Sequence, residues 1–219
     1  HPESALISYE IAKYWQQQGN KYNAETAPSY QKDLVKAVDI CNKAIEKFPD
    51  SRGATNCKAL IARIKGKSLN AQVEASNAPD KLGRALVQYK NIDHVFCRWI
   101  HTTPAIKKEI KRINADWNDR EAKLMRYLTS LAPEKTWQYT LPNDKDYQPN
   151  SAEISTQSGK IGEDYILLLS ADEKFTADGS NALAYSEISI TNLAIFENTN
   201  GFENTESSYY VVNRQTGQP

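Results

Sequence analysis

The chain has 219 residues, of which 40% are hydrophobic and 25% charged, and its 27 Lys and Arg residues balance 27 Asp and Glu residues. A formal net charge of zero disfavours a nucleic-acid-binding protein, because such proteins normally carry a basic excess. The mean hydropathy is −0.66 and the longest apolar run, at residues 165–169, is far too short to cross a bilayer, so we expect no membrane-spanning segment. The length predicts two modest units whose cores need no metal or disulfide.

The first 66 residues have the apolar periodicity of helices, which are predicted over residues 5–18, 28–48 and 51–65. In the first of these, apolar residues recur at steps of three and four and form one amphipathic stripe of Leu6, Ile7, Ile11, Tyr14 and Trp15. Short connections make consecutive helices pack antiparallel. We therefore expect residues 1–66 to form a helical N-terminal domain of antiparallel hairpins.

One stretch of this region resembles the second helix of a tetratricopeptide repeat. In residues 36–49, the small residues Ala37 and Ala44 would let neighbouring helices approach closely, and Pro49 would end the unit. A solenoid normally needs at least three stacked repeats, and only one is visible. The alternative is a helical pair that packs on another part of the chain.

From Lys67 onward the apolar period shortens to two, as in half-buried strands. Strands are predicted over residues 69–75, 82–89, 95–100, 152–156, 165–169, 184–196 with a break at Asn192, and 208–213. Short strands at irregular spacing are typical of an antiparallel β-sandwich. The fold class is therefore α+β. We assign the sandwich to residues 67–182, and residues 183–219 to the truncated start of a second β domain.

A helix is predicted inside the β region, over about residues 104–132. Its apolar residues fall at steps of three, four and seven, at Ile106, Ile110, Ile113, Trp117, Leu124, Leu128 and Leu131. One long inserted helix would bury this stripe, Trp117 included, and leave its Lys, Arg, Asp and Glu residues facing water.

The only compact cluster of metal-ligand types is His94, Cys97 and His101. On a helix this spacing would put the three side chains on one face, where they could bind zinc. On a strand His94 points away from the other two, and residues 95–100 are rich in β-formers. We expect a strand and no metal. No nucleophile motif, phosphate-binding glycine loop or other cofactor motif is present, so we expect no cofactor and no enzyme.

Aromatic residues are the remaining candidates for a functional surface, because they stack on sugars or anchor protein partners. The candidate interaction residues are Trp117, Trp137, Tyr139, Tyr209 and Tyr210. Alternation in the neighbouring strands makes core packing the expected role of most other aromatic side chains.

Six segments carry a family resemblance: residues 43–51 (KAIEKFPDS), 53–60 (GATNCKAL), 84–98 (RALVQYKNIDHVFCR), 161–168 (IGEDYILL), 189–195 (SITNLAI) and 210–219 (YVVNRQTGQP). The first two resemble the helical N-terminal region of large bacterial alpha-2-macroglobulin-like proteins. The next two resemble strands of that family's first macroglobulin domain. The last two resemble the beginning of the domain that follows it.

The resemblance implies a non-catalytic N-terminal scaffold fragment of a large exported bacterial protein, whose family entraps proteases or protects the envelope. It implies a location in the periplasm or at the outer membrane or cell surface, with the signal removed. The partners would be the remaining domains of its own chain and proteases. None of Cys41, Cys57 and Cys97 has the family's thioester context. The alternatives are a helical-repeat adaptor, which holds a peptide on residues 5–65, and a surface carbohydrate-binding module.

Cys41 and Cys57 each lie eight residues from Pro49, so they sit at similar height in an antiparallel hairpin that turns there. Two readings are open. An oxidising envelope would allow a Cys41–Cys57 disulfide with Cys97 left free, and two packed thiols explain the positions equally well.

Overall fold

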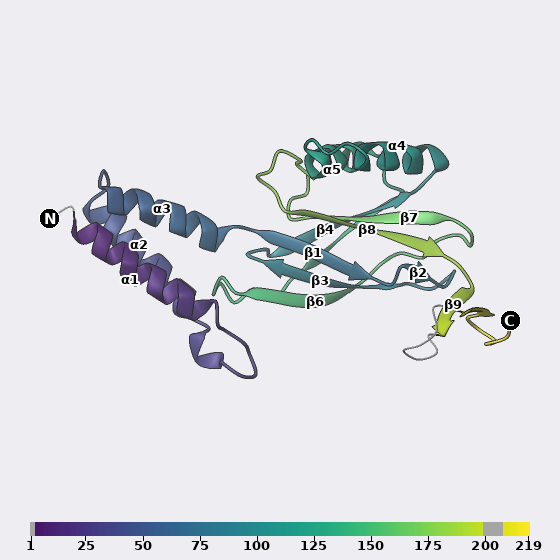
Figure 1. The fold of residues 1–219 in the computed structure, drawn as a ribbon, viewed down its shortest axis with the longest axis horizontal. Helices are drawn as coiled ribbons and strands as arrows, with labels where there is room; N and C mark the ends of the chain where they lie inside the picture. The colour runs from purple at the N-terminus through teal and green to yellow at the C-terminus, as the bar shows by residue number, and fades with distance from the viewer. Residues whose placement is uncertain (1–2, 199–207) are drawn as a thin grey trace. The chain divides into compact units, whose positions relative to one another are not determined.

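The computed structural model describes residues 3–198 and 208–219 (Figure 1). The chain divides into two compact units. The first comprises the chain up to Leu69 together with residues 88–94 and 140–152. The second comprises residues 70–87, 95–139 and the chain from Glu153 onward. The first unit thus contains two later stretches of the sequence in addition to the helices.

Three helices make up most of the first unit: α1 (Ser4–Gly19), α2 (Asp33–Lys47) and α3 (Arg52–Lys65), with a 3-10 turn at Pro28–Tyr30 before α2. Ser51 caps α3, because its hydroxyl oxygen accepts a hydrogen bond from the Ala54 N–H at 3.1 Å. Each helix packs against the other two around one apolar core. The three predicted helices are confirmed in position, whereas the tetratricopeptide-like interpretation is not confirmed.

The side of α1 that enters the core differs from the stripe of large apolar residues in the sequence. The buried positions of α1 are Ala5, Ala12 and Gly19, which are seven residues apart. At Gly53 of α3 an added Cβ would lie 2.2 Å from the carbonyl carbon of Ala5. Small residues on both helices therefore let α1 and α3 approach closely.

A polar network holds residues 140–152 in the first unit. The buried Gln148 side-chain amide donates to the Gly19 carbonyl at 3.1 Å and to the Gln31 carbonyl at 3.3 Å. In turn the Gln31 amide donates to the buried Asp146 carboxylate at 2.9 Å. Asn91 donates to the carbonyls at the end of α3, both at 2.9 Å. The bonds of Gln31 and Gln148 join segments that are more than 100 residues apart, and buried polar groups normally have such partners.

Ten strands form three sheets in the described residues: β1 (Ser68–Val73), β2 (Ser76–Asn77), β3 (Arg84–Lys90), β4 (His94–His101), β5 (Lys135–Thr140), β6 (Pro149–Ser155), β7 (Asp164–Ser170), β8 (Leu183–Ile190), β9 (Leu193–Asn198) and β10 (Ser208–Asn213). The sheets have the orders β1-β3-β6, β2-β8-β7-β4-β5 and β10-β9. The five-stranded sheet is mixed and not purely antiparallel, because β2 pairs parallel to β8. The α+β class is confirmed.

β8 belongs to the five-stranded sheet, where it pairs antiparallel to β7 from Leu183 to Ser189. Residues 183–219 are predicted as the start of a second β domain, and the boundary of that predicted domain falls between the paired strands β7 and β8. The separate two-stranded sheet of β9 and β10 begins only at Leu193. Part of that expected domain, residues 199–207, lies outside the described residues.

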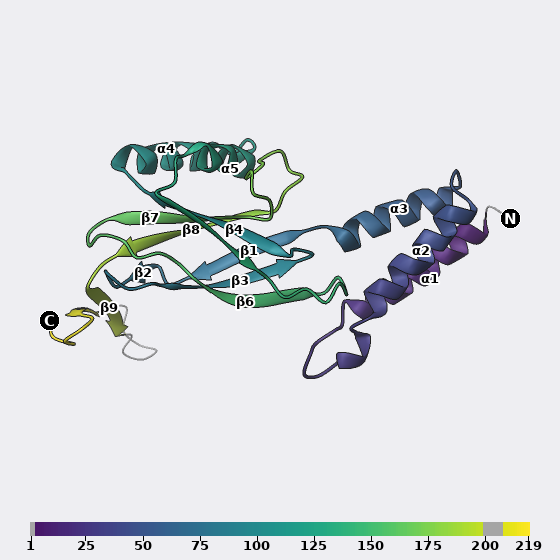
Figure 2. The ribbon, with the colours of Figure 1, turned by 180° about the vertical axis from the view of Figure 1, so that it is seen from behind.

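The continuous apolar run of β7 is explained by burial on both of its faces. Ile166 and Leu168 pack against helices α4 (Pro104–Asn114) and α5 (Arg120–Ser130), which cover one side of the sheet (Figure 2). On the other side, the Tyr165 ring stacks on Trp99 with centroids 4.9 Å apart. The five-stranded sheet is therefore the middle layer of the second unit.

The prediction of one long helix over residues 104–132 is wrong in one respect, because this segment forms two helices, α4 and α5. The break at residues 115–119 follows from local polar chemistry. The Asp116 carboxylate accepts the Asn118 backbone N–H at 3.1 Å, and Asp119 adopts a left-handed conformation with φ of 50°. Ile110, Ile113, Leu124 and Leu128 are buried as expected. Trp117, expected in the core, is 91% exposed.

A charged cluster at the start of β7 gives a pH-dependent prediction. Partial burial alone would raise the pKa of Asp164, but hydrogen bonds from Lys107 and Ser189 and the charge of Lys107 hold that pKa below its ordinary value. A lowered carboxyl pKa contributes stability above the unfolded pKa, and this stability is lost as the pH falls through the folded pKa.

We therefore expect Asp164→Asn to lower the free energy of unfolding by about 1 kcal/mol at pH 7 and by much less below about pH 3. Urea unfolding at the two pH values measures this. Glu46→Gln, which changes an exposed carboxylate on α2, is the matched control and is expected to change neither value. A loss for Asp164→Asn that is the same at both pH values would contradict the ionic explanation.

Candidate functional site

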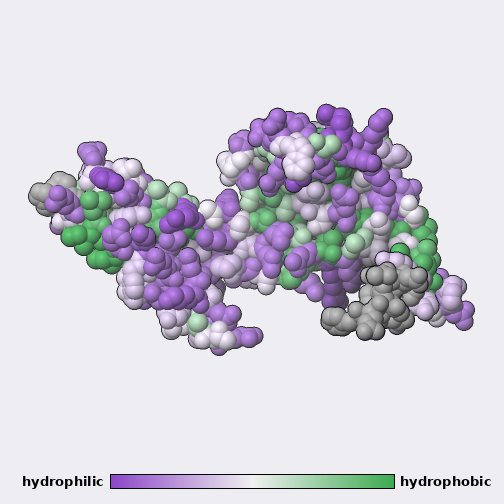
Figure 3. All heavy atoms as spheres, in the orientation of Figure 1, coloured by the Kyte–Doolittle hydropathy of each residue, from purple (hydrophilic) through white to green (hydrophobic). Residues whose placement is uncertain are grey.

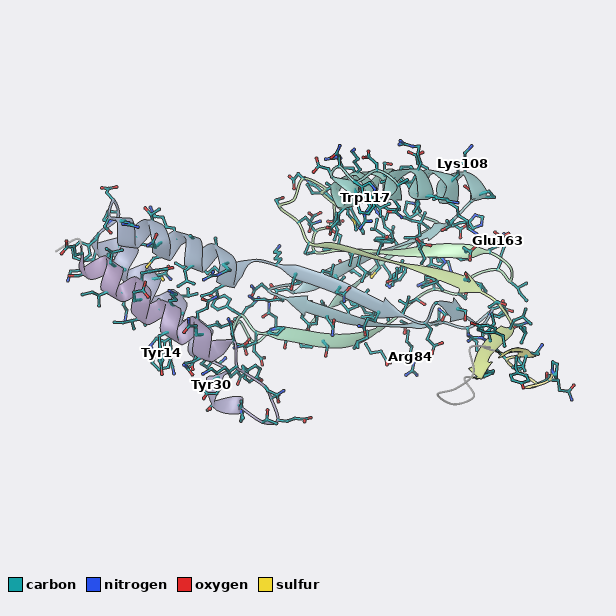
Figure 4. The ribbon with its side chains drawn as sticks, in the orientation of Figure 1. Tyr14, Tyr30, Arg84, Lys108, Trp117 and Glu163 are labelled. Carbon is teal, nitrogen blue, oxygen red and sulfur yellow. The ribbon has the colours of Figure 1, made fainter. Side chains whose placement is uncertain are left out.

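The five aromatic residues predicted as an interaction surface lie in three separate places of the second unit. Trp117, labelled in Figure 4, lies in the turn between α4 and α5. Trp137 and Tyr139 lie on β5, and Tyr209 and Tyr210 lie on β10. They do not form one shared platform. Each place therefore has to be judged by its own exposure and neighbours.

The two aromatic residues of β5 take part in packing. Trp137 and Tyr139 are both partly buried. The Tyr139 hydroxyl donates to the Ser155 carbonyl at 3.2 Å, and the buried Trp137 indole N–H has no acceptor among the described residues. Neither side chain presents an open surface, so β5 is the weakest of the three candidates.

The β9–β10 hairpin exposes a set of large apolar side chains that we call the hairpin surface: Leu193, Ile195, Phe196, Tyr209, Tyr210 and Val211. Each of them is between 46% and 68% exposed. Phe196 pairs with Tyr210 and Ile195 with Val211, and successive pairs point to opposite faces of the hairpin. Both faces of this two-stranded sheet are therefore apolar and open.

Arg214 ties the base of the hairpin to the rest of the second unit. Its guanidinium donates to the Leu193 carbonyl at 3.1 Å and to the Ser76 hydroxyl at 2.5 Å. A broad hollow of about 1,530 Å³ lies between the hairpin and β2, with Ile195, Phe196 and Arg214 among its lining residues. The hairpin is held at its base, and its large apolar side chains are open to solvent.

A second apolar surface, on the first unit, was not predicted as functional. Ile7, Ile11 and Tyr14 follow one another at helical spacing on the outer side of α1, and all three are exposed. Figure 3 shows a hydrophobic patch over this helix. The sequence carries the periodic signal, but periodicity alone does not tell a core-facing stripe from an open one.

Trp117 borders a hollow of about 570 Å³ between the α4–α5 turn and the loop that follows β7. Asp119, Arg120, Glu121, Met125 and Asn181 are among its other lining residues. The hollow combines one large aromatic surface with planar polar side chains. Of these lining residues the sequence predicts only Trp117 as functional, because residues 117–125 and 177–183 meet only in the folded chain.

The candidate metal ligands are not brought together. Cys97 is buried on β4, where burial raises the pKa of its thiol to about 12. His94 is exposed beside Thr140, and the His101 ring bonds the Glu163 carboxylate at 2.7 Å. Within residues 3–198 and 208–219, no three His, Cys, Asp or Glu side chains lie close enough together to hold a metal ion.

Cys41 and Cys57 lie side by side in the core of the first unit. Both are buried free thiols. Burial raises the pKa of Cys41, and a hydrogen bond with Cys57 raises it further. The structure thus brings the predicted pair together, and the disulfide between them stays a prediction.

The described part of the chain contains no helix with the length and apolar character needed to cross a bilayer. No family model matches the sequence, and no curated protein matches it either.

Solved structures that are distantly similar to this chain include the following three. Native alpha-2-macroglobulin from Escherichia coli, spanning domains NIE-MG1, has a TM-score of 0.40 and 12% identity over 70% of this chain and 72% of that one. The same protein spanning MG0-NIE-MG1 has a TM-score of 0.39 and 11% identity over 69% and 47%. The CARDB domain of the PF1109 protein from Pyrococcus furiosus, in complex with di-metal ions, has a TM-score of 0.32 and 13% identity over 57% and 92%. The likeness concerns the fold alone.

Proposed function

We propose that this chain is a non-catalytic scaffold segment of a large exported bacterial alpha-2-macroglobulin-like protein. In this proposal the helices of the first unit form a tetratricopeptide-like domain, and the second unit is a macroglobulin-like sandwich. The protein would act in the periplasm or at the cell surface, in protease entrapment or envelope protection. The six sequence segments that resemble this family support the assignment.

The observation that carries the scaffold role is the hairpin surface. A two-stranded sheet is at best marginally stable alone in water, and monomeric proteins rarely leave contiguous large apolar side chains open to solvent. Both faces of the β9–β10 hairpin are apolar and exposed. Such a hairpin is stabilised when another protein surface covers it. We therefore assign it to contact with a further β domain of the same polypeptide.

The non-catalytic part of the proposal is supported by the chemistry of the titratable groups. The Cys97 thiol is buried with a raised pKa, which opposes a nucleophilic role. His101 is engaged by Glu163, and the Ser189 hydroxyl donates to the Asp164 carboxylate, whose lowered pKa makes it a weak base. A screen with generic esters and peptides, together with metal analysis of the purified chain, tests this part.

Site-specific cross-linking tests the contact. In bacterial cells that produce the protein, p-benzoylphenylalanine at position 210 is expected to cross-link to another β domain after irradiation, and mass spectrometry identifies the linked peptide. The same probe at position 161 is the control, because Ile161 is 59% exposed in the same unit but lies outside the hairpin surface. Equal cross-linking at positions 210 and 161 would contradict the proposal.

A further inference from the structure

Trp117, labelled in Figure 4, is the most exposed large hydrophobic residue described in this protein. It is one of the lining residues of the 570 Å³ hollow. Tryptophan is highly buried on average in folded proteins. The burial of apolar surface does not explain why an indole stands 91% exposed at this turn. An exposed aromatic plane beside a hollow is a common feature of ligand sites.

The backbone on both sides of Trp117 is fixed. The Asp116 carboxylate accepts the Asn118 backbone N–H at 3.1 Å and pairs with the Lys123 ammonium at 2.5 Å. Asp119 then turns the chain through a left-handed conformation into α5. The turn therefore fixes the backbone from which the indole projects, so this backbone needs no further ordering when a ligand binds.

The opposite wall of the hollow, the loop after β7, is also ordered by its own bonds. Asn181 donates to the Ser170 hydroxyl at 2.9 Å and to the Thr176 carbonyl at 3.2 Å. Phe175 is buried, and the Arg98 guanidinium lies over its ring at 3.9 Å from the centroid. Because both walls are anchored, the hollow is largely preformed, as small-molecule sites usually are.

The polar groups that line the hollow are of both signs and are free to bind a ligand. In the described part of the chain, the carboxylates of Asp119 and Glu121 make no hydrogen bond or ion pair. Arg120 adds guanidinium donors to the lining. Carboxylates, guanidinium groups and amides are planar groups that bond hydroxyl groups at fixed angles.

We propose that the Trp117 hollow is a binding site for a short, uncharged saccharide. One face of a pyranose ring carries C–H groups with a slight positive charge, and these lie favourably against the negative face of an indole. The hydroxyl groups at the ring edge would bond Asp119, Glu121 and Arg120. The volume lies in the range of about 300–1,000 Å³ that small-molecule sites occupy.

Two other ligand classes fit the lining less well. A phosphate or other anion would meet Asp119 and Glu121 against the single cation Arg120. An apolar ligand would leave these charged groups without water or partners. An organic cation would also lie against the indole, so the experiment includes one as a competitor.

The test is binding of maltotriose, cellotriose and triacetylchitotriose to the full chain. All four tryptophans are described, and Trp117 is the exposed one, so its fluorescence reports on this site. We expect at least one of the three saccharides to give a saturable emission change and to protect the indole from acrylamide. Calorimetry, which does not depend on the indole, is expected to show binding weakened about tenfold or more in Trp117→Ala.

Three further variants make the result specific. Trp117→Tyr keeps an aromatic plane and is expected to retain binding, and Glu121→Gln is expected to weaken binding severalfold. Tyr14→Ala removes an exposed aromatic residue of the first unit and is expected to bind like the wild type. If Trp117→Ala does not fold, Trp117→Tyr and Glu121→Gln decide the matter.

Any of three results would overturn the proposal. The first is the lack of a saturable response to all three saccharides up to about 20 mM. The second is unchanged saccharide binding in Trp117→Ala and Glu121→Gln. The third is binding of tetramethylammonium without binding of any saccharide, which would assign the indole to a cation.

Discussion

Gly53→Ala is expected to lower the free energy of unfolding of the first unit by about 3 kcal/mol, although alanine is the better helix former by about 1 kcal/mol. The reason is the closeness of α1. A Cβ at this position would lie 2.2 Å from the Ala5 carbonyl carbon and 2.5 Å from both the Ala5 oxygen and the Leu6 nitrogen. These are backbone atoms of a packed helix, so no side chain can rotate away, and α1 must shift from α3.

Thermal and urea unfolding of the first unit measure this effect, with circular dichroism at 222 nm as the helical signal. Gly66→Ala is the matched control, because an added Cβ there would have no neighbour closer than 3.4 Å. The control is expected to change stability by about 0.5 kcal/mol or less. If Gly53→Ala were as stable as Gly66→Ala, α1 and α3 would not be packed as the structure has them.

The same contact shows what could and could not be predicted from the sequence of the first unit. Helix positions follow from apolar spacing, and the three helices lie where the spacing predicts them. The apolar spacing does not predict which face of α1 enters the core, because Ile7, Ile11 and Tyr14 have the stronger periodic signal and are exposed. The core side is set instead by the close approach of Ala5 and Gly53, which lie 48 residues apart in the chain.

Strands were predicted where the alternation is long, and β3, β4, β7 and β8 lie at the expected places. The two-residue strand β2 is too short to carry a periodic signal, and its parallel pairing with β8 depends on residues more than 100 positions away. The polar network of Gln31, Asp146 and Gln148 has the same non-local character. Side-chain periodicity carries no information about such partners.

The α4–α5 turn illustrates a conflict between two local signals. Ile113, Trp117 and Leu124 keep helical spacing, and this predicted one continuous helix with a buried Trp117. The polar residues around Trp117 favour a turn, because Asp116 bonds the backbone N–H of Asn118 and competes with the helix. Residues 115–119 therefore form a turn, and the Trp117 indole is exposed as a consequence.

The second large expected effect on stability comes from Cys41 and Cys57 in the core of the first unit. In protein that folds in the presence of oxidised glutathione, we expect a disulfide between these two residues and a free thiol at Cys97. Their side chains are buried side by side and hydrogen-bonded to each other, whereas Cys97 is buried in the second unit. Each disulfide formed passes two electrons and two protons from the protein thiols to glutathione disulfide, which becomes two thiols.

This disulfide is expected to add about 3 kcal/mol to the free energy of unfolding, because it closes a loop of about 15 residues in the unfolded chain. Formation of the disulfide should depend on whether the oxidant is present during folding or added afterwards. Burial raises the pKa of Cys41 and leaves little thiolate once the reduced chain has folded. Refolding with glutathione disulfide should therefore form the bond, and adding the same oxidant to the folded reduced protein should form little. Mass spectrometry of unreduced peptides and unfolding with and without reductant measure both results, with Cys97→Ala as the control. Three free thiols after oxidative refolding would show that the pair is simply packed.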